Sequence, residues 1–509
     1  MLARIETATL IGMDCVRVEV EVDVSGAWPS YQIVGLADAA VQEAKERIRT
    51  AWKNSGLNFP ANHRIVINLA PADIRKEGVA FDLPMALGMY LAAQGIQVDN
   101  TGSVFIGELA LDGGVRRATG ILPFAHYAKQ NKFTKVFVPA GNAREAALVS
   151  GLEIYPVVNL AELVSHIRGE KMIAQYRVSA EANDFDAESE DHGFDLKYIC
   201  GQEFAKRALE IAASGAHNLL LSGPPGSGKT MLARTMPSIL PLMTDEEAIE
   251  VARVYSVAGL IGDNSRLPRV RPFRSPHHSA SNAALSGGGK NPRPGEITLA
   301  HRGVLFLDEF PEFSRSVLEG LRQPLEDGII NVARVHGTVS FPARFTLLAS
   351  RNPCPCGYAG DEEKACTCTM QMITAYNKKI SGPILDRIDL HVEVARVKYE
   401  KFSESGTAEN SQSVRQRVLR ARARQKNRFT GTKIFTNSEM AAAEINKHCV
   451  LTPESNELLR GAVENLHLSA RSYHRILKVA RTIADLADSD NICLEHVAEA
   501  LQFRLKEGN

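Results

Sequence analysis

The stretch Gly223-Pro-Pro-Gly-Ser-Gly-Lys-Thr230 decides the fold of this chain. It follows the apolar run Leu219–Leu221 and opens a segment, beginning at Met231, that is expected to be helical. A glycine-rich loop between strand and helix lets backbone N–H groups converge on phosphates, so it predicts a nucleoside triphosphate site. Lys229 is placed to reach the outer phosphates and the Thr230 hydroxyl to ligate Mg²⁺. The expected nucleotide-binding residues of the loop are Gly223, Pro224, Pro225, Gly226, Ser227, Gly228, Lys229 and Thr230.

Two carboxylates follow a second apolar run, Val304–Leu307. Asp308 is predicted to hold the Mg²⁺ and Glu309 to activate the attacking water, which would make the site a hydrolase. A third apolar run, Phe345–Ala349, leads to Asn352, which is predicted to sense the γ-phosphate. The alternative for Asn352 is an ordinary turn residue, because Pro353 follows it.

Five further motifs narrow the class of nucleotide-binding protein. They are Gly201-Gln-Glu-Phe-Ala-Lys-Arg-Ala-Leu209, Arg274-Ser-Pro-His-His278, Asn352-Pro-Cys-Pro-Cys-Gly357, Gly382-Pro-Ile-Leu-Asp-Arg-Ile-Asp389 and Ser469-Ala-Arg-Ser-Tyr-His-Arg475. With these motifs the chain resembles the magnesium-chelatase-like AAA+ ATPases of the ComM and YifB type. One departure is Ser350-Arg351 before Asn352, where small or apolar residues are expected.

The resemblance implies two arginines at the ATP site. Arg387 would act as an arginine finger in trans and Arg471 as the sensor arginine of a lid, because a guanidinium can meet the developing phosphate charge. A surface ion pair is the alternative for either residue. The resemblance further implies a homo-hexamer that migrates branched and single-stranded DNA during recombination in natural transformation. Recombination proteins would be its further partners.

The sequence predicts a multidomain chain with an α+β part, an α/β part with a parallel sheet, and an all-helical end. The resemblance implies that the first part is Lon-protease-like, with a ribosomal-S5-type fold. The expected ranges are 1–170 for this part, 171–195 for an acidic linker, 196–396 for the AAA+ core, 397–413 for a second linker and 414–509 for the helical lid.

The Lon-protease-like part lacks the residues of a Ser-Lys dyad. In Glu77-Gly-Val-Ala-Phe-Asp82, Ala80 stands where the proteases have serine, and Leu122 replaces the expected lysine. Covalent peptidase chemistry therefore has no attacking group. We expect this part to pack between subunits or to hold nucleic acid.

Four of the eight cysteines crowd into one stretch, Cys354, Cys356, Cys366 and Cys368. Four thiolates on one loop can form a closed tetrahedral Zn²⁺ site in the predicted loop 354–368. The C-x-C spacing is tighter than the common C-x₂-C, so reduced thiols without metal and a redox role are alternatives.

Two basic stretches are candidate DNA contacts. The insertion 269–302 carries the glycine-rich tip Ser286-Gly-Gly-Gly-Lys290, and we expect Leu285, Lys290 and Arg293 to grip a DNA backbone. A solvated hairpin is the alternative. The second stretch, 414–428, is rich in arginine, and a solvated face or a subunit contact is equally compatible with it.

The composition of the chain limits the classes of function that remain. The 509 residues are 44% hydrophobic, and the 59 basic and 59 acidic residues cancel, so any nucleic-acid site must be local. Neither a signal peptide nor a membrane span is visible, so a cytoplasmic location without membrane partners is expected. Two other functions stay open: a metal-chelatase motor subunit, although no D-x-S-x-S motif is present, and ATP-dependent protein remodelling without proteolysis.

Overall fold

The computed structural model describes residues 2–78, 80–97, 99–177, 193–262, 267–289, 292–334, 337–361, 363–397 and 409–504. They form two compact units. The first runs to Arg177 and also contains α8 (Asp245–Ala258), which the sequence places in the nucleotide-binding core; the second holds the other described residues up to Thr244 and from Arg269 onward. No helix among the residues described is long and apolar enough to cross a bilayer.

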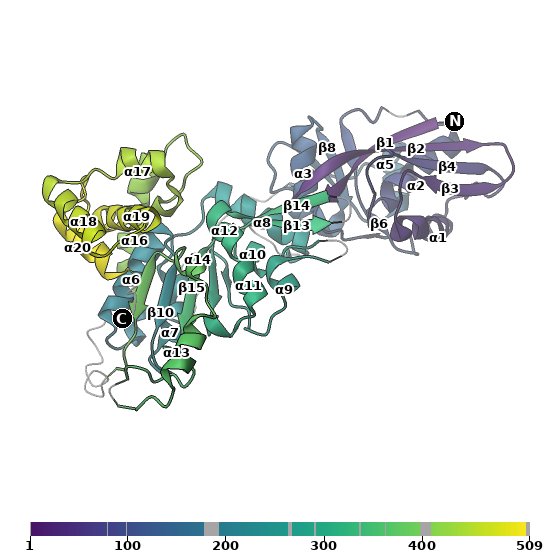
Figure 1. The fold of residues 1–509 in the computed structure, drawn as a ribbon. Coiled ribbons are helices and arrows are strands. Elements are labelled where there is room, and N and C mark those ends of the chain that lie inside the picture. Colours follow the sequence, from purple (N-terminus) through teal and green to yellow (C-terminus); the bar gives the residue numbers. More distant parts are fainter. Residues whose placement is uncertain are drawn as a thin grey trace. The chain divides into compact units, whose positions relative to one another are not determined.

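A four-stranded sheet organises the first unit, with the order β1-β2-β4-β3. Its strands are β1 (Leu2–Ile11), β2 (Asp14–Ser25), β3 (Ser30–Val34) and β4 (Arg64–Ala70), and only the β3–β4 pair is parallel. Alternate residues of β2 are buried, as the predicted alternation requires. The helices α1 (Ala39–Asn54) and α2 (Asp82–Gln94) share the apolar core of this sheet (Figure 1).

A smaller parallel sheet, β5-β8-β9, completes the first unit with a second apolar cluster. Leu122 is fully buried in that cluster, and Ala80 packs against it, so the positions matched to the Ser-Lys dyad lie among apolar side chains. The elements are β5 (Ser103–Phe105), β6 (Glu108–Leu109), β7 (Val115–Arg116), α3 (Ile121–Gln130), β8 (Lys135–Pro139), η1 (Ala140–Asn142), α4 (Ala143–Ala146), β9 (Glu153–Val157) and α5 (Leu160–Ile167).

The core of the second unit is a five-stranded parallel sheet with the order β11-β12-β15-β10-β16. The strands are β10 (Leu219–Ser222), β11 (Phe273–Arg274), β12 (Val304–Leu307), β15 (Thr346–Arg351) and β16 (Leu390–Glu393). The three strands expected from the apolar runs are therefore confirmed, and β11 and β16 extend the sheet at its two edges. Leu219 and Leu221 pack in the core with α6 (Glu203–Gly215) and α7 (Lys229–Ile239).

Short elements connect these strands. A hairpin that the sequence did not predict, β13 (Ile329–Arg334) with β14 (Gly337–Pro342), lies between β12 and β15. The other elements are η3 (Leu196–Tyr198), α9 (Asn282–Ser286), α10 (Glu296–Leu299), η4 (Phe310–Glu312), α11 (Arg315–Gly320), α12 (Arg322–Asp327), α13 (Met370–Asn377) and α14 (Gly382–Leu385).

The described end of the chain, 409–504, is helical, as expected. Its elements are α16 (Ser411–Arg428), η5 (Asn437–Glu439), α17 (Ala442–His448), α18 (Pro453–Asn465), α19 (Ala470–Leu486) and α20 (Leu494–Gln502). The arginine-rich helix α16 uses much of its charge inside this unit: Arg417 binds Glu210, Arg422 donates to the Ala213 carbonyl, and Arg428 binds the buried Asp485. Arg417 and Arg422 therefore link the lid to α6 of the core, whereas Arg428 binds within the lid.

Candidate active site

The glycine-rich loop lies at the carboxyl end of β10, where the backbone must make tight turns. Gly226 and Gly228 have φ values of +78° and +91°, a region that other residues rarely adopt. Lys229 lies across the loop, and its Nζ donates to the carbonyls of Gly223 (2.8 Å) and Pro224 (2.9 Å). Burial lowers the pKa of Lys229, although the carboxylates of Asp308 and Glu309 oppose this shift. A phosphate group would replace the carbonyls as a stronger partner for the ammonium group.

The residues predicted to hold Mg²⁺ contact each other directly. The Thr230 hydroxyl donates to Asp308 Oδ2 at 2.9 Å. Adjacent oxygen ligands of octahedral Mg²⁺ lie about 2.9 Å apart, so the pair matches the spacing of two ligands on one ion. The Ser350 hydroxyl donates to the other oxygen of Asp308, which links the ends of β12 and β15. The departure from an apolar residue at Ser350 therefore has a structural reason.

Glu309 is restrained by its own backbone, by β15 and by a histidine that follows β11. Its φ is +53°, in the left-handed region, and its backbone N–H donates to Ser350 Oγ at 3.2 Å. The side chain is half exposed, and its Oε2 lies 3.1 Å from His278 Nδ1. Sequence reasoning quoted His278 within a motif but gave it no role, because nothing local indicates that it meets Glu309.

Asn352 completes the group at this edge of the sheet. Its Oδ1 accepts a bond from Lys229 Nζ at 3.3 Å, although the two residues are 123 positions apart in the chain. The predicted residues Lys229, Thr230, Asp308, Glu309 and Asn352 are thus brought together where β10, β12 and β15 end. This arrangement suits a metal-bound triphosphate with a carboxylate beside its outermost phosphate.

Arg387 lies at the amino ends of the strands of the same sheet, opposite the carboxyl ends where the glycine-rich loop lies. It comes just before β16, whose first residue, Leu390, pairs with Leu219 at the start of β10, whereas the glycine-rich loop follows the end of β10. Its side chain is 12% exposed and donates to the Pro383 carbonyl and to Glu326. The arginine therefore does not face the triphosphate site of its own chain.

Arg471, on α19, meets the same carboxylate as Arg387. Its NH2 lies 3.3 Å from Glu326 on α12, and hydrogen bonding to Arg387 lowers the pKa of Glu326. Glu326 was not expected, because its partners lie far away in sequence. The structure thus brings together the two arginines implied by the resemblance, away from the triphosphate site of their own chain.

The four clustered cysteines converge after β15. Their sulfur atoms all lie within 4.8 Å of one another, and Cys354 lies 3.4 Å from Cys356 and 3.7 Å from Cys366. Tetrahedral zinc with Zn–S distances near 2.3 Å places its sulfurs about 3.8 Å apart, which this group matches. Backbone hydrogen bonds from Tyr358 and Thr367 lower the pKa of Cys356 to about 5, which favours its thiolate. A backbone hydrogen bond from Cys368 opposes the shift of Cys366, but burial and the thiols of Cys356 and Cys354 raise its pKa to about 12.

This cysteine loop packs directly on the glycine-rich loop. Gly357 has a φ of +88°, and a Cβ atom there would lie 2.6 Å from Cδ of Pro225. The close approach explains why glycine follows Cys356. A metal that fixes the cysteine loop would therefore also support one side of the triphosphate site.

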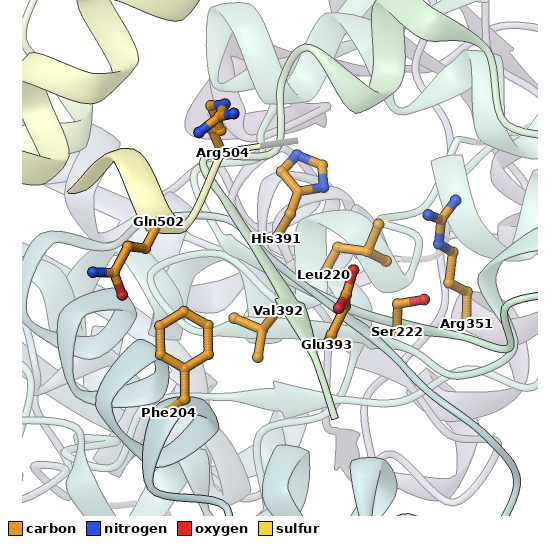
Figure 2. A pocket seen from close by; sticks show the side chains of 9 residues that line it. All are labelled: Phe204, Leu220, Ser222, Arg351, His391, Val392, Glu393, Gln502 and Arg504. Atoms are coloured by element: carbon orange, nitrogen blue, oxygen red, sulfur yellow. The ribbon is translucent and has the colours of Figure 1, made fainter. Parts of the chain in front are cut away.

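A cavity of about 500 Å³ lies beside the same strands. Ser222 pairs with Arg351 on one side and Glu393 on the other, and Figure 2 shows these side chains along one part of the cavity. Burial lowers the pKa of His391, in its lining, to about 4, so this imidazole is neutral at pH 7. The lining contains none of the residues predicted to bind ATP, metal or DNA.

The structure describes only part of the predicted DNA-binding tip. Leu285 lies in α9 and is fully buried, so the expectation that it grips DNA is wrong for this conformation. Its side chain packs in the interior, which the local pattern does not indicate, because a run of glycines follows it in the sequence. Arg293 is exposed, and Lys290 lies outside the described residues. Arg274 in the same insertion binds Glu296 and is structural.

Comparison with known proteins agrees with this geometry. The model for magnesium chelatase subunit ChlI matches residues 195–402, and the model for its C-terminal part matches 408–504. A further model, subunit ChlI of Mg-chelatase, matches 20–142. The competence protein ComM of Haemophilus influenzae is 43% identical over 99% of this chain and 97% of its own length.

This chain belongs to the magnesium-chelatase-like ComM and YifB family. The uncharacterized YifB proteins of Escherichia coli and Salmonella typhimurium are each 40% identical, over 99% of this chain and 97% of their own lengths. Membership of this AAA+ family implies ATPase activity with ATP and Mg²⁺, and the site has the residues for both. The resemblance to the ComM and YifB family is therefore confirmed along nearly the whole chain.

Proposed function

We propose that this member of the ComM and YifB family is a hexameric ATP-driven DNA motor that migrates branched DNA. The observation that carries the proposal is the separation of two half-sites on one parallel sheet. The triphosphate half lies at the carboxyl ends of the strands, and Arg387 lies at their amino ends, together with Arg471. A heterologous contact between subunits in a ring joins such opposite surfaces repeatedly.

In this proposal each chain contributes to two ATP sites. Lys229, Thr230 and Asp308 hold the phosphates and Mg²⁺, Asn352 senses the outer phosphate, and Glu309 activates the water. The neighbouring subunit supplies Arg387 and Arg471, whose charges stabilise the transition state. Bound ATP would compete with Glu326 for both arginines. The presence or absence of ATP would therefore change the contacts of the core and of the lid in the neighbouring subunit at the same time.

The cysteine loop would carry one structural zinc ion. Its four sulfurs form a closed donor set, and zinc with four protein ligands has no open position for catalysis. The ion would brace Gly357 against Pro225 beside the phosphates. Reduced thiols without metal remain the alternative that elemental analysis tests.

DNA as substrate is supported by the relative named competence protein ComM and by the exposed Arg293. Competence for transformation requires strands to be exchanged between incoming and resident DNA, which suits a branch-migration role. The domain assignments 1–170 and 414–509, including the Lon-protease-like character of the first, belong to the same proposal.

Stimulation of ATP turnover discriminates among the functions. We expect single-stranded and branched DNA to raise the ATPase rate, and we expect the protein to separate a four-stranded junction into two duplexes by branch migration when ATP is present. Unfolded protein should not raise the ATPase rate and should not be cleaved. The Glu309→Gln variant is the control for contaminating ATPases. Stimulation by unfolded protein alone would favour remodelling, and stimulation by a porphyrin-metallating partner alone would favour the chelatase alternative.

A further inference from the structure

One end of the larger sheet in the first unit carries an exposed tryptophan. Trp28 lies in the connection between β2 and β3, and it is 92% exposed. The only other tryptophan of the chain, Trp52, is fully buried. Burying a side chain of this size removes 150–250 Å² from water, at roughly 25 cal/mol for each Å², so a tryptophan left in water is unusual.

A cation and an exposed histidine share this end of the sheet with Trp28. Arg64 begins β4 and pairs with Ser25 at the end of β2 and with Ser30 at the start of β3, so it lies between the two strands that Trp28 connects. Arg64 and the preceding His63 are both exposed. The register therefore places one large aromatic ring and two basic side chains at the same end of the sheet.

Carboxylates are absent from the two connections at this end, β2 to β3 and the segment that leads into β4. Residues 24–31 and 55–64 contain neither aspartate nor glutamate, in a chain whose basic and acidic residues are equal in number. The nearest acidic residue along β2 is Asp23. The segments around Trp28 consequently carry a formal charge of +1, from Arg64, while the chain as a whole is neutral.

We infer that this end of the sheet, defined by Trp28, His63 and Arg64, is a contact site for a single strand of nucleic acid. An indole stacks on an unpaired base, while the guanidinium of Arg64 meets a phosphate, and such stacking tolerates any sequence. A duplex does not fit as well, because its bases are stacked on each other and do not present their faces. The inference rests on the proposed function for the identity of the strand, which would be DNA.

The two tryptophans allow a direct test on the full chain without ATP. A thymidine oligonucleotide added to the wild-type protein should quench the emission of Trp28. Trp28→Phe should bind nearly as well, because phenylalanine also stacks, but without quenching, since Trp52 is buried. Trp28→Ala should bind about 5- to 150-fold more weakly, which corresponds to the loss of one stacked base.

Charge provides an independent arm of the test. Arg64→Ala should weaken binding and flatten its dependence on salt, because one phosphate contact is lost. The matched controls are Leu111→Ala, which removes an exposed apolar side chain of the same unit, and Lys171→Ala, which removes an exposed cation. Both controls should bind the oligonucleotide as the wild type does. Unchanged thermal unfolding of Trp28→Ala would establish that the variant is folded.

The outcomes separate this inference from the proposed function. If Trp28→Ala binds DNA and depends on salt as the wild type does, the DNA site lies elsewhere and only the inference is overturned. If Trp28→Ala instead changes the sedimentation of the protein with no effect on DNA binding, Trp28 is a subunit contact, which also overturns it. A wild-type protein that binds no oligonucleotide and is not stimulated by DNA would contradict both.

Discussion

Glu309 shows how much of the chemistry depends on the position of a single residue. Three features set the position of the Glu309 carboxylate in this structure: its left-handed backbone, the hydrogen bond from its N–H to Ser350 Oγ, and the contact with His278. Two of these three restraints come from other segments of the chain. The side chain can act as a base only if it leaves His278 and turns toward a water beside the outermost phosphate.

Replacing Glu309 with glutamine should therefore slow ATP hydrolysis about 100-fold or more, which is typical of removing a general base. ATP affinity should change little, because Lys229, Thr230 and Asp308 remain. Steady-state turnover and equilibrium binding of a fluorescent ATP analogue measure the two effects. Glu312→Gln is the matched control, since this nearby carboxylate pairs with Lys379 and should be dispensable for hydrolysis. Hydrolysis at the wild-type rate by Glu309→Gln would show that the base is another residue.

At the scale of elements, the cysteine loop and the glycine-rich loop act as one piece. The contact of Gly357 with Pro225 means that the first loop supports the second, while the four sulfurs hold the first loop in shape. A metal ion bound by the four sulfurs would take no part in ATP hydrolysis, but it would make the loop that binds phosphate more rigid.

Protein purified without chelators should contain about one zinc ion per chain, and Cys366→Ser/Cys368→Ser should contain none. The same variant should bind ATP more weakly, with a higher KM, because the support for Pro225 is loosened. Cys493→Ser, which removes a thiol of the lid, is the control and should retain the metal. Elemental analysis of fresh protein decides the question, and absence of zinc from the wild type would refute the proposed metal site.

At the scale of the whole molecule, the proposed function implies that one chain contributes to two ATP sites, because Arg387 and Arg471 lie away from the glycine-rich loop of their own chain. The parallel sheet fixes this separation, because the carboxyl and amino ends of its strands lie at opposite edges. Glu326 holds Arg387 and Arg471 together at their own edge. Activity should consequently depend on assembly rather than on the isolated chain.

Mixing of two inactive variants tests this dependence. Arg387→Ala keeps an intact triphosphate half and Glu309→Gln keeps an intact arginine, so mixed rings should recover activity at about a quarter of their interfaces if equal amounts assemble at random. ATPase rates measured across mixing ratios should peak near equal proportions. As a control, Arg387→Ala mixed with the double variant Arg387→Ala/Glu309→Gln should stay inactive. Lack of recovery in mixtures that demonstrably co-assemble would argue against an arginine supplied in trans.

The sequence by itself determined the residues of the triphosphate site and the three central strands of the sheet around it. The loop from Gly223 to Thr230, the carboxylates after Val304–Leu307 and the polar residue after β15 are each local patterns. Once three parallel strands are assumed, their carboxyl ends meet at one edge, and Lys229 and Asn352 become neighbours without further information. The family resemblance rested on the same local motifs and extended along the chain.

Only the tertiary structure decided what a side chain does when its partner is distant in sequence. Leu285 lies beside a run of glycines yet is buried, and two arginines of α16, Arg417 and Arg428, are held by Glu210 and Asp485. The meeting of Arg387 and Arg471 at Glu326 likewise depends on how the lid packs on the core. Burial and ion pairing are set by long-range packing, because the periodicity of a segment shows which face is apolar but not which residue will cover it.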